Sequence, residues 1–154
     1  MSVILKTVTR ENWLEALALS VNDDQAQFTP SVAVSLAKVY IKPDGDNVNY
    51  IPFAIYHNDK MVGFIMHAYE EDTEDQYWIN GFLIDKGHQG KGYGNAALEK
   101  MIKYIRGTQG KCNKIKLSVH RENKNAYELY KKYGFTETGD SIGEDIILYL
   151  SVYQ

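Results

Sequence analysis

The sequence predicts an α/β (α+β) domain, because segments with the periodicity of strands alternate with segments that have the periodicity of helices. These segments run in the order β-α-α-β-β-β-α-β-α-β-β, without an internal repeat or a low-complexity linker. The 154 residues suffice for one hydrophobic core and are too few for two ordinary domains. We therefore expect residues 1–154 to form a single domain around one mixed sheet.

The N-terminal part is expected to hold one strand and two short helices. Residues 3–8 alternate in the manner of a strand. A first helix is predicted by four apolar residues at helical spacing, Trp13, Leu14, Leu17 and Val21. Thr9 is its expected N-cap. A second helix is predicted by a proline at its first position and two residues on its apolar side, Pro30, Leu36 and Val39.

Three strands are expected in the middle of the chain. Residues 51–56 and 61–69 flank the turn 57–60, which is a hairpin signal. The acidic loop 70–75 then leads into an apolar strand at 77–84.

The C-terminal half is expected to alternate helices and strands. A helix at 95–106 is predicted by one apolar stripe, Leu98, Met101, Ile102 and Ile105. The remaining elements are a strand at 114–119, a helix at 123–133, and two strands at 135–142 and 145–153 around Gly143. Because a helix crosses between them, the strands at 77–84 and 114–119 should run parallel.

The most informative segment is Gln89-Gly90-Lys91-Gly92-Tyr93-Gly94, between a strand and a helix. Free N–H groups and the helix dipole favour an anion at such a helix N-terminus, and glycines let the backbone approach it closely. A Rossmann fingerprint would need glycine in place of Asn95, and a Walker loop would need glycine in place of Asp85. The segment therefore predicts a phosphate-bearing cofactor of another class, or else a glycine-rich turn without a ligand.

Composition excludes several classes of protein. Hydrophobic residues make up 44% and charged residues 24%, as in ordinary globular proteins. No apolar stretch approaches the ~18 residues that would predict a membrane span, and the first residues lack the features of a signal peptide. The lone Cys112 excludes an internal disulfide, and the histidines have no metal-binding spacing. We expect a cytoplasmic protein without a metal or a membrane partner.

The net charge of −3 conceals a strong asymmetry. Residues 85–132 carry twelve Lys and Arg against four acidic residues, which leaves five basic and sixteen acidic residues elsewhere. An anionic cofactor and a cationic amine would together account for both halves. A nucleic-acid-binding domain would account only for the basic half, and the pI of about 5.8 speaks against it.

A second motif, N-x-x-A-x-x-x-Y, begins at Asn123 and ends at Tyr130. Asn123 can cap the helix and still present its amide to a ligand, and Tyr130 lies two turns further along the same face. Gly134-Phe135 completes a Y-x-x-x-G-F ending. Together with the spacing Gln89-x-x-Gly92-x-Gly94, this motif resembles the GNAT family of N-acetyltransferases.

The resemblance covers essentially the whole chain. It implies a GNAT-type mixed, mostly antiparallel sheet with helices on both faces and two splayed parallel strands that form an acetyl-CoA cleft. The residues implied for acetyl-CoA are Phe82, Leu83, Ile84, Gln89, Gly90, Lys91, Gly92, Tyr93, Gly94, Asn95, Asn123 and Tyr130. The pantetheine arm would pair with the strand at 82–84, and a backbone N–H near Leu83 would stabilise the oxyanion. Tyr130 would protonate the departing CoA thiolate during direct transfer in a ternary complex.

The N-terminal half is expected to choose the amine. It contains Gln27-Phe28 and Ser35-Leu36-Ala37, followed by the acidic run 70–75 and then by the segment 89–92, Gln-Gly-Lys-Gly. This pattern resembles that of bacterial spermine/spermidine (diamine) N-acetyltransferases. The residues that the resemblance implies for the substrate are Gln27, Phe28, Glu70, Glu71, Asp72 and Asn80. Some polyamine enzymes of the family carry a carboxylate where this chain has Asn80, so the general base stays unassigned. The acids of the loop 70–75 could act through water or could simply be solvated.

Other functions stay open at this point. The same chemistry could act on an aminoglycoside, an amino acid or a protein N-terminus. A non-catalytic acyl-CoA-binding module would also keep this fold. Dimers are common in the family, so a homodimer is possible, and the C-terminal strand pair could supply the interface.

Overall fold

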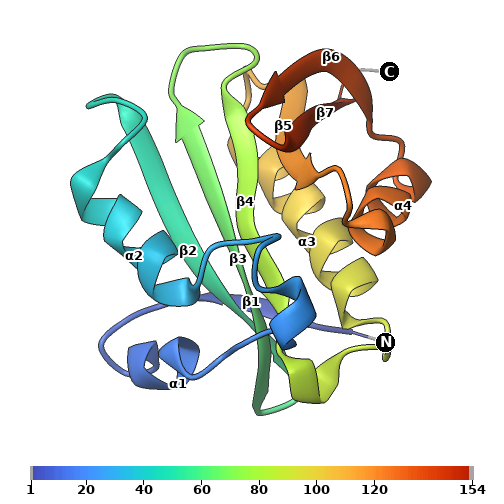
Figure 1. The fold of residues 1–154 in the computed structure, drawn as a ribbon. Helices are drawn as coiled ribbons and strands as arrows, with labels where there is room; N and C mark the ends of the chain where they lie inside the picture. The colour runs from blue at the N-terminus through green and yellow to red at the C-terminus, as the bar shows by residue number, and fades with distance from the viewer. Residues whose placement is uncertain (1, 153–154) are drawn as a thin grey trace.

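The computed structural model describes residues 2–152. Within this range, seven strands form one sheet in the order β1-β2-β3-β4-β5-β7-β6 (Figure 1). The elements are β1 (Ile4–Thr7), α1 (Trp13–Leu17), η1 (Asp23–Gln25), α2 (Val32–Ile41), β2 (Val48–His57), β3 (Lys60–Glu70), β4 (Tyr77–Ile84), η2 (Lys86–His88), α3 (Tyr93–Thr108), β5 (Lys114–His120), α4 (Lys124–Lys132), β6 (Thr136–Ile142) and β7 (Asp145–Ser151). The strand pairs are antiparallel except β4 and β5, which are parallel as expected.

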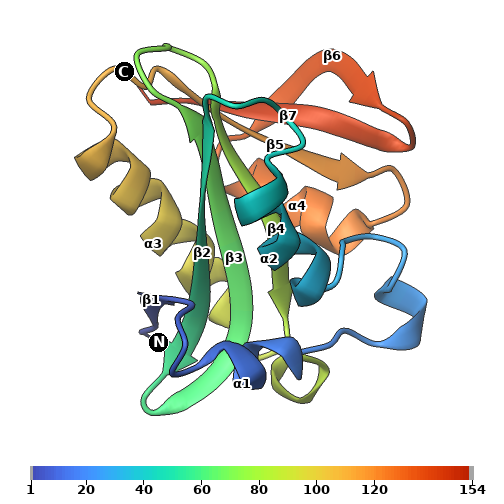
Figure 2. The same cartoon turned by 90° about the vertical axis from the view of Figure 1, so that its left-hand side faces the viewer.

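Helices cover both faces of the sheet, as the resemblance implied. Figure 2 views β2 and β3 nearly edge-on, with α3 on one side and α1 and α2 on the other. The larger core cluster joins α3 and α4 to one face of the sheet through Leu98, Met101 and Tyr130. The smaller cluster places Ala16 of α1 and Val32 of α2 against the opposite face.

The parallel strands β4 and β5 separate soon after they meet. Their register contains one pair, Trp78 with Lys116, whereas β5 pairs with β7 along its whole length. In Figure 2, β5 turns away from β4 toward β7. The expected splayed pair is therefore present, and the C-terminal part of β4 is left without β5 beside it.

A β-bulge bends β4 next to this opening. The register between β3 and β4 shifts between Phe64 and Met66, and Gly81 has a φ of +64°. A Cβ at Gly81 would lie 2.6 Å from the Ser35 hydroxyl oxygen and 3.2 Å from the Phe64 ring, so only glycine fits. The apolar pattern of the strand gave no sign of this irregularity.

The first helix is shorter than the sequence predicts. It spans only Trp13–Leu17, and its N-cap is Asn12, whose side chain accepts a hydrogen bond from the Thr9 N–H at 2.8 Å. The apolar side chains that suggested a buried stripe are largely exposed, and Ala16 is the buried residue. The chain leaves the helix because Ser20 bonds to the connection after β4, through Asp85 Oδ1 at 3.0 Å and the Lys86 N–H at 2.8 Å.

The second helix starts two residues later than expected, at Val32 instead of Pro30. Ser31 is the N-cap of α2, since its side chain accepts from the Val34 N–H at 3.3 Å, so Pro30 precedes the cap. Val32 and Ser35 are buried, whereas Val39 is exposed, because α2 rests on the sheet with its N-terminal half. The other elements match within three residues; the expected strand end at Tyr153 lies outside the described residues.

Candidate active site

A cavity of about 790 Å³ follows β4 along the opening between β4 and β5. Its walls come from β4, the end of β5, the first half of α4, the segment 89–95 and the N-terminal segment 21–30. An eight-residue strand is roughly 25 Å long. The cavity thus joins the glycine segment after Ile84 to the acidic side chain of Glu70 beyond the other end of the strand.

The glycine segment forms an open anion cradle. Gly90 and Gly92 have φ values of +76° and +88°, in the left-handed region that favours glycine. Gly92 is the N-cap of α3, and among the described residues the N–H groups of Tyr93, Gly94 and Asn95 have no acceptor. Of the six residues at positions 90–95, all except Lys91 line the cavity. Three free N–H groups at the start of a 16-residue helix fit a pyrophosphate.

The side chains of Gln89 and Lys91 do not offer hydrogen-bond donors to an anion in this cradle. Lys91 is exposed and outside the cavity wall. The Gln89 amide nitrogen donates to the Ile84 carbonyl at 2.9 Å and to Gln25 Oε1 at 3.0 Å. Gln89 therefore holds the turn in place, and the free donors are backbone groups further on.

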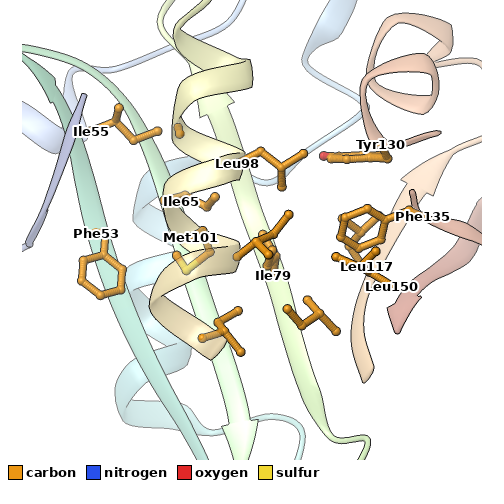
Figure 3. Close-up of a cluster of buried hydrophobic side chains, with 14 of the residues drawn as sticks. Phe53, Ile55, Ile65, Ile79, Leu98, Met101, Leu117, Tyr130, Phe135 and Leu150 are labelled. Atoms are coloured by element: carbon orange, nitrogen blue, oxygen red, sulfur yellow. The ribbon is translucent and has the colours of Figure 1, made fainter. Parts of the chain in front are cut away.

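Asn123 and Tyr130 lie on the cavity side of α4. Asn123 Oδ1 caps the helix by accepting from the Ala126 N–H at 3.3 Å. The Tyr130 ring packs against Phe135 with centroids 5.9 Å apart, and its hydroxyl points away from Phe135 toward Leu98 of α3 (Figure 3). This hydroxyl has no hydrogen-bond partner within residues 2–152. Burial raises the pKa of Tyr130 well above its ordinary value, so the phenol is protonated at neutral pH.

Asn80 of β4 also lines the cavity, and its Oδ1 atom is buried without a partner in the described part of the chain. An amide oxygen accepts a hydrogen bond but does not act as a base at neutral pH. The position therefore suits binding of an N–H donor such as an amine.

The structure brings together only some of the residues expected for the substrate. Phe28 lines the cavity and packs on His120 with ring centroids 5.1 Å apart. Half-buried Glu70 lines it as well. Gln27 is exposed and lies outside the wall, because Gln25, two residues earlier, has the inward-facing position.

Glu71 and Asp72 also lie outside this cavity. Strand β3 ends at Glu70, and the chain then turns outward through Asp72, which has a φ of +63°. Asp72 forms an exposed ion pair with Lys111 at 3.1 Å. The acidic loop therefore contributes one carboxylate, that of Glu70, to the cavity wall.

Two further carboxylates at the cavity were not expected from the sequence. Asp44, in the loop before β2, accepts a hydrogen bond from the Tyr50 hydroxyl, and burial together with this bond raises the pKa of Tyr50 to about 12. Asp145, at the start of β7, accepts from the Ser118 hydroxyl at 3.3 Å. Neither residue stands in a motif, and only the fold brings them to the cleft.

Cys112 is not part of the cavity wall and is buried, with its thiol directed at the Lys114 carbonyl. Burial raises the pKa of this thiol to about 11, so it is a poor nucleophile at neutral pH. Within residues 2–152, no cluster of three or more His, Cys, Asp or Glu could hold a metal ion. No helix in the same range is long and apolar enough to cross a membrane.

Comparison with known families gives a match to the acetyltransferase (GNAT) family over residues 17–135. The chain belongs to the GNAT family. It is thus an acetyl-CoA-dependent N-acetyltransferase, and the cradle at the start of α3 is a fitting site for the pyrophosphate of that cofactor.

Individual relatives are named for the amines that they acetylate. The spermine/spermidine N(1)-acetyltransferase of Bacillus subtilis (strain 168) is 32% identical over 156 residues, which cover 96% of this chain and 98% of that protein. A spermidine N-acetyltransferase from Vibrio cholerae, solved with CoA and spermine, has a TM-score of 0.76 and 20% identity over 97% of this chain and 95% of its own. The aminoglycoside acetyltransferase AAC(6')-Ib, solved with coenzyme A, also has a TM-score of 0.76, at 16% identity over 98% of this chain and 95% of its own. The two solved structures share the fold with this GNAT protein and do not distinguish its acceptor.

Proposed function

We propose that this GNAT protein transfers an acetyl group to a primary amine of a small polycation such as spermidine or spermine. The observation that carries the proposal is the charge of the cavity wall. Among the residues that the structure describes, three carboxylates line it, those of Asp44, Glu70 and Asp145, against one lysine, Lys38. Several carboxylates around one cavity attract a polycation more strongly than a monoamine. The relationship to the Bacillus subtilis polyamine enzyme supports the same acceptor class.

The cofactor would be held along β4. The free N–H groups of Tyr93, Gly94 and Asn95 would bind the pyrophosphate. The edge of β4 at Phe82 and Leu83, which β5 leaves open, would pair with the pantetheine arm. The Ile84 carbonyl already accepts from Gln89. When bound, acetyl-CoA supplies the thioester whose acetyl group is transferred.

Tyr130 would act as the general acid. Its hydroxyl is protonated at neutral pH, has no partner among residues 2–152, and lies on the helix that faces β4 across the cavity. A phenol so placed can give its proton to a thiolate leaving group. An N–H near Leu83 would stabilise the oxyanion during direct attack.

The amine must lose a proton before it attacks, since an alkylammonium has a pKa of roughly 10.4. Asn80 Oδ1 would accept a hydrogen bond from the amine without removing that proton. The proton would pass through water to a carboxylate of the cavity wall, of which Glu70 is half-buried and lies nearest in the chain to β4.

The charge argument is tested by replacing Glu70 with Gln. We expect the KM for spermidine to rise about fivefold, since a close ion pair contributes about 1 kcal/mol, while the KM for a monoamine of similar length changes less. Glu74→Gln is the matched control, because Glu74 is an exposed acid of the same loop outside the cavity wall. Equal changes for the two amines in Glu70→Gln would contradict the proposed recognition of a polycation.

A further inference from the structure

Two glutamine side chains join the N-terminal wall of the cavity to the cofactor cradle. Gln25 Nε2 donates to Gln89 Oε1 at 3.2 Å, and Gln89 Nε2 donates to Gln25 Oε1 at 3.0 Å. The two amides thus form a reciprocal pair across 64 positions of the sequence. Both residues line the cavity.

The surrounding contacts engage most of the polar groups of this pair. Gln89 Nε2 uses its second proton on the Ile84 carbonyl at 2.9 Å. Gln25 Oε1 also accepts from the Asn22 N–H at 3.2 Å, and Gln89 Oε1 accepts from the Asn22 amide at 3.5 Å. Both amide oxygens and both protons of Gln89 Nε2 are engaged within the protein, whereas Gln25 Nε2 keeps one N–H without an acceptor among the described residues. Gln89 has no side-chain donor left for a ligand, so its contribution to the site is through position.

Each glutamine is attached to a different part of the site. Gln89 directly precedes Gly90, whose left-handed backbone begins the cradle. On the other side, the Gln25 carbonyl accepts from the Phe28 N–H at 3.0 Å, and the Phe28 ring packs on His120 at the end of β5. A continuous path of contacts therefore runs from the anion cradle, through Gln89 and Gln25, to Phe28 in the N-terminal wall of the cavity.

We propose that Gln25 and Gln89 are positioning residues that couple occupancy of the acetyl-CoA cradle to the wall that carries Phe28. Fixing the cradle around a pyrophosphate fixes Gln89 and, through the paired amides, the turn from Gln25 to Phe28. An occupied cradle thereby lowers the ordering cost of the acceptor side, which is a positive coupling between the two ligands. The assignment of Phe28 to the acceptor side rests on the proposed function.

Hydrogen exchange measured with and without saturating CoA tests the coupling without any acceptor. In the wild type, CoA should slow exchange in both segments, 89–95 and 20–28. In Gln25→Ala, CoA should still protect 89–95, whereas the protection of 20–28 should fall to less than half. Gln25→Glu keeps the size of the side chain but places an acceptor against Gln89 Oε1, so it should act in the same way.

Asp24→Ala is the matched control, because it truncates an exposed side chain in the same one-turn helix η1. It should retain the wild-type protection of both segments. Wild-type protection of 20–28 by CoA in both Gln25 variants would overturn the proposal.

Steady-state kinetics of the same variants distinguish a failure of this proposal from a failure of the proposed function. Loss of the amide pair should raise the KM for the amine by about threefold to tenfold, the range expected for one or two net hydrogen bonds, with a smaller change in kcat. In free-energy terms, the increase in the KM for the amine should be smaller in the double variant Gln25→Ala/Gln89→Ala than the sum of the increases in the two single variants, because the residues act as a pair. If spermidine is not acetylated at all, the proposed acceptor is wrong, while the exchange experiment still decides the coupling.

Discussion

At the scale of single residues, burial determines which protons the site can move. Tyr130 is 7% exposed, and burial raises its pKa, so it remains a proton donor across the physiological range. Tyr127, one turn earlier on α4, is half-buried, and its hydroxyl donates to Glu137 at 2.8 Å. The same residue type therefore has a buried hydroxyl without a partner among residues 2–152 at one position and a hydroxyl engaged with Glu137 at the other.

Replacing Tyr130 with Phe should lower kcat by about two orders of magnitude, because a positioned general acid contributes at least that much. CoA affinity, measured by calorimetry, should change little, since the ring and its packing on Phe135 are kept. Tyr127→Phe is the matched control on the same helix and should keep wild-type turnover. A wild-type kcat in Tyr130→Phe would remove this hydroxyl from the mechanism.

Cys112 should be unreactive in the folded protein. Its thiol is buried and its pKa is raised to about 11, so little thiolate is present at pH 8. We expect alkylation by iodoacetamide, followed by mass spectrometry, to be slow in buffer and rapid in denaturant. Rapid alkylation of the native protein would show that the thiol is accessible and ionised.

At the scale of elements, the start of α3 is the part of the site that could be predicted best from the sequence. Its signals are local: a strand, a glycine turn and a helix that follow one another in the chain, and the cap of α4 at Asn123 is local in the same way. Gln25, Asp44 and Asp145 could not be predicted, because they reach the cavity only when distant segments pack. The length of α1 could not be predicted for the same reason. Its apolar spacing suggested a longer helix, but the helix ends at Leu17 and Ser20 instead contacts Asp85 and Lys86, which are distant in the sequence.

Gly94→Ala tests the cradle without disturbing the fold. A Cβ at this position would make only ordinary contacts, the nearest at 3.8 Å to Ile84, yet it would stand at the helix N-terminus in the cavity wall. We expect acetyl-CoA binding to weaken at least about tenfold, through loss of close backbone approach, with an unchanged melting temperature.

Gly107→Ala in the same helix supplies the control for that variant. No atom lies within 4 Å of a Cβ there, so CoA affinity should stay the same and the helix should gain up to about 1 kcal/mol of stability. If Gly94→Ala bound acetyl-CoA as tightly as the wild type, the cradle would not be the pyrophosphate site.

At the scale of the whole molecule, one buried histidine links stability to pH. His67 of β3 is fully buried and stacked on Tyr69, and Nδ1 lies 2.9 Å from the Trp78 carbonyl oxygen. Burial lowers the pKa of His67 to about 4, against an ordinary value of 6.5. Between these values the unfolded chain binds a proton that the folded protein does not, so stability falls as the pH falls from 6.5 toward 4.

We expect urea unfolding to show this loss, which integrates to about 3 kcal/mol over the full window. Most of it should appear between pH 6.5 and 5, above the ordinary pKa of carboxylates, which is near 4. His67→Phe removes the titrating group, so its unfolding free energy should depend much less on pH in that range. An equal pH dependence in the variant and the wild type would assign the effect to other groups.

The central claim is that this GNAT enzyme acetylates a small polycation, and wild-type turnover on a panel of amines tests it most directly. CoA release from acetyl-CoA would be followed with a thiol reagent, and each product would be identified by mass spectrometry. The panel would contain spermidine, spermine, a monoamine, an aminoglycoside, an amino acid and a peptide with a free N-terminus. The account predicts the highest kcat/KM for spermidine or spermine, with a product one acetyl group heavier. A higher kcat/KM for any of the other amines, or no CoA release with any polyamine, would contradict it.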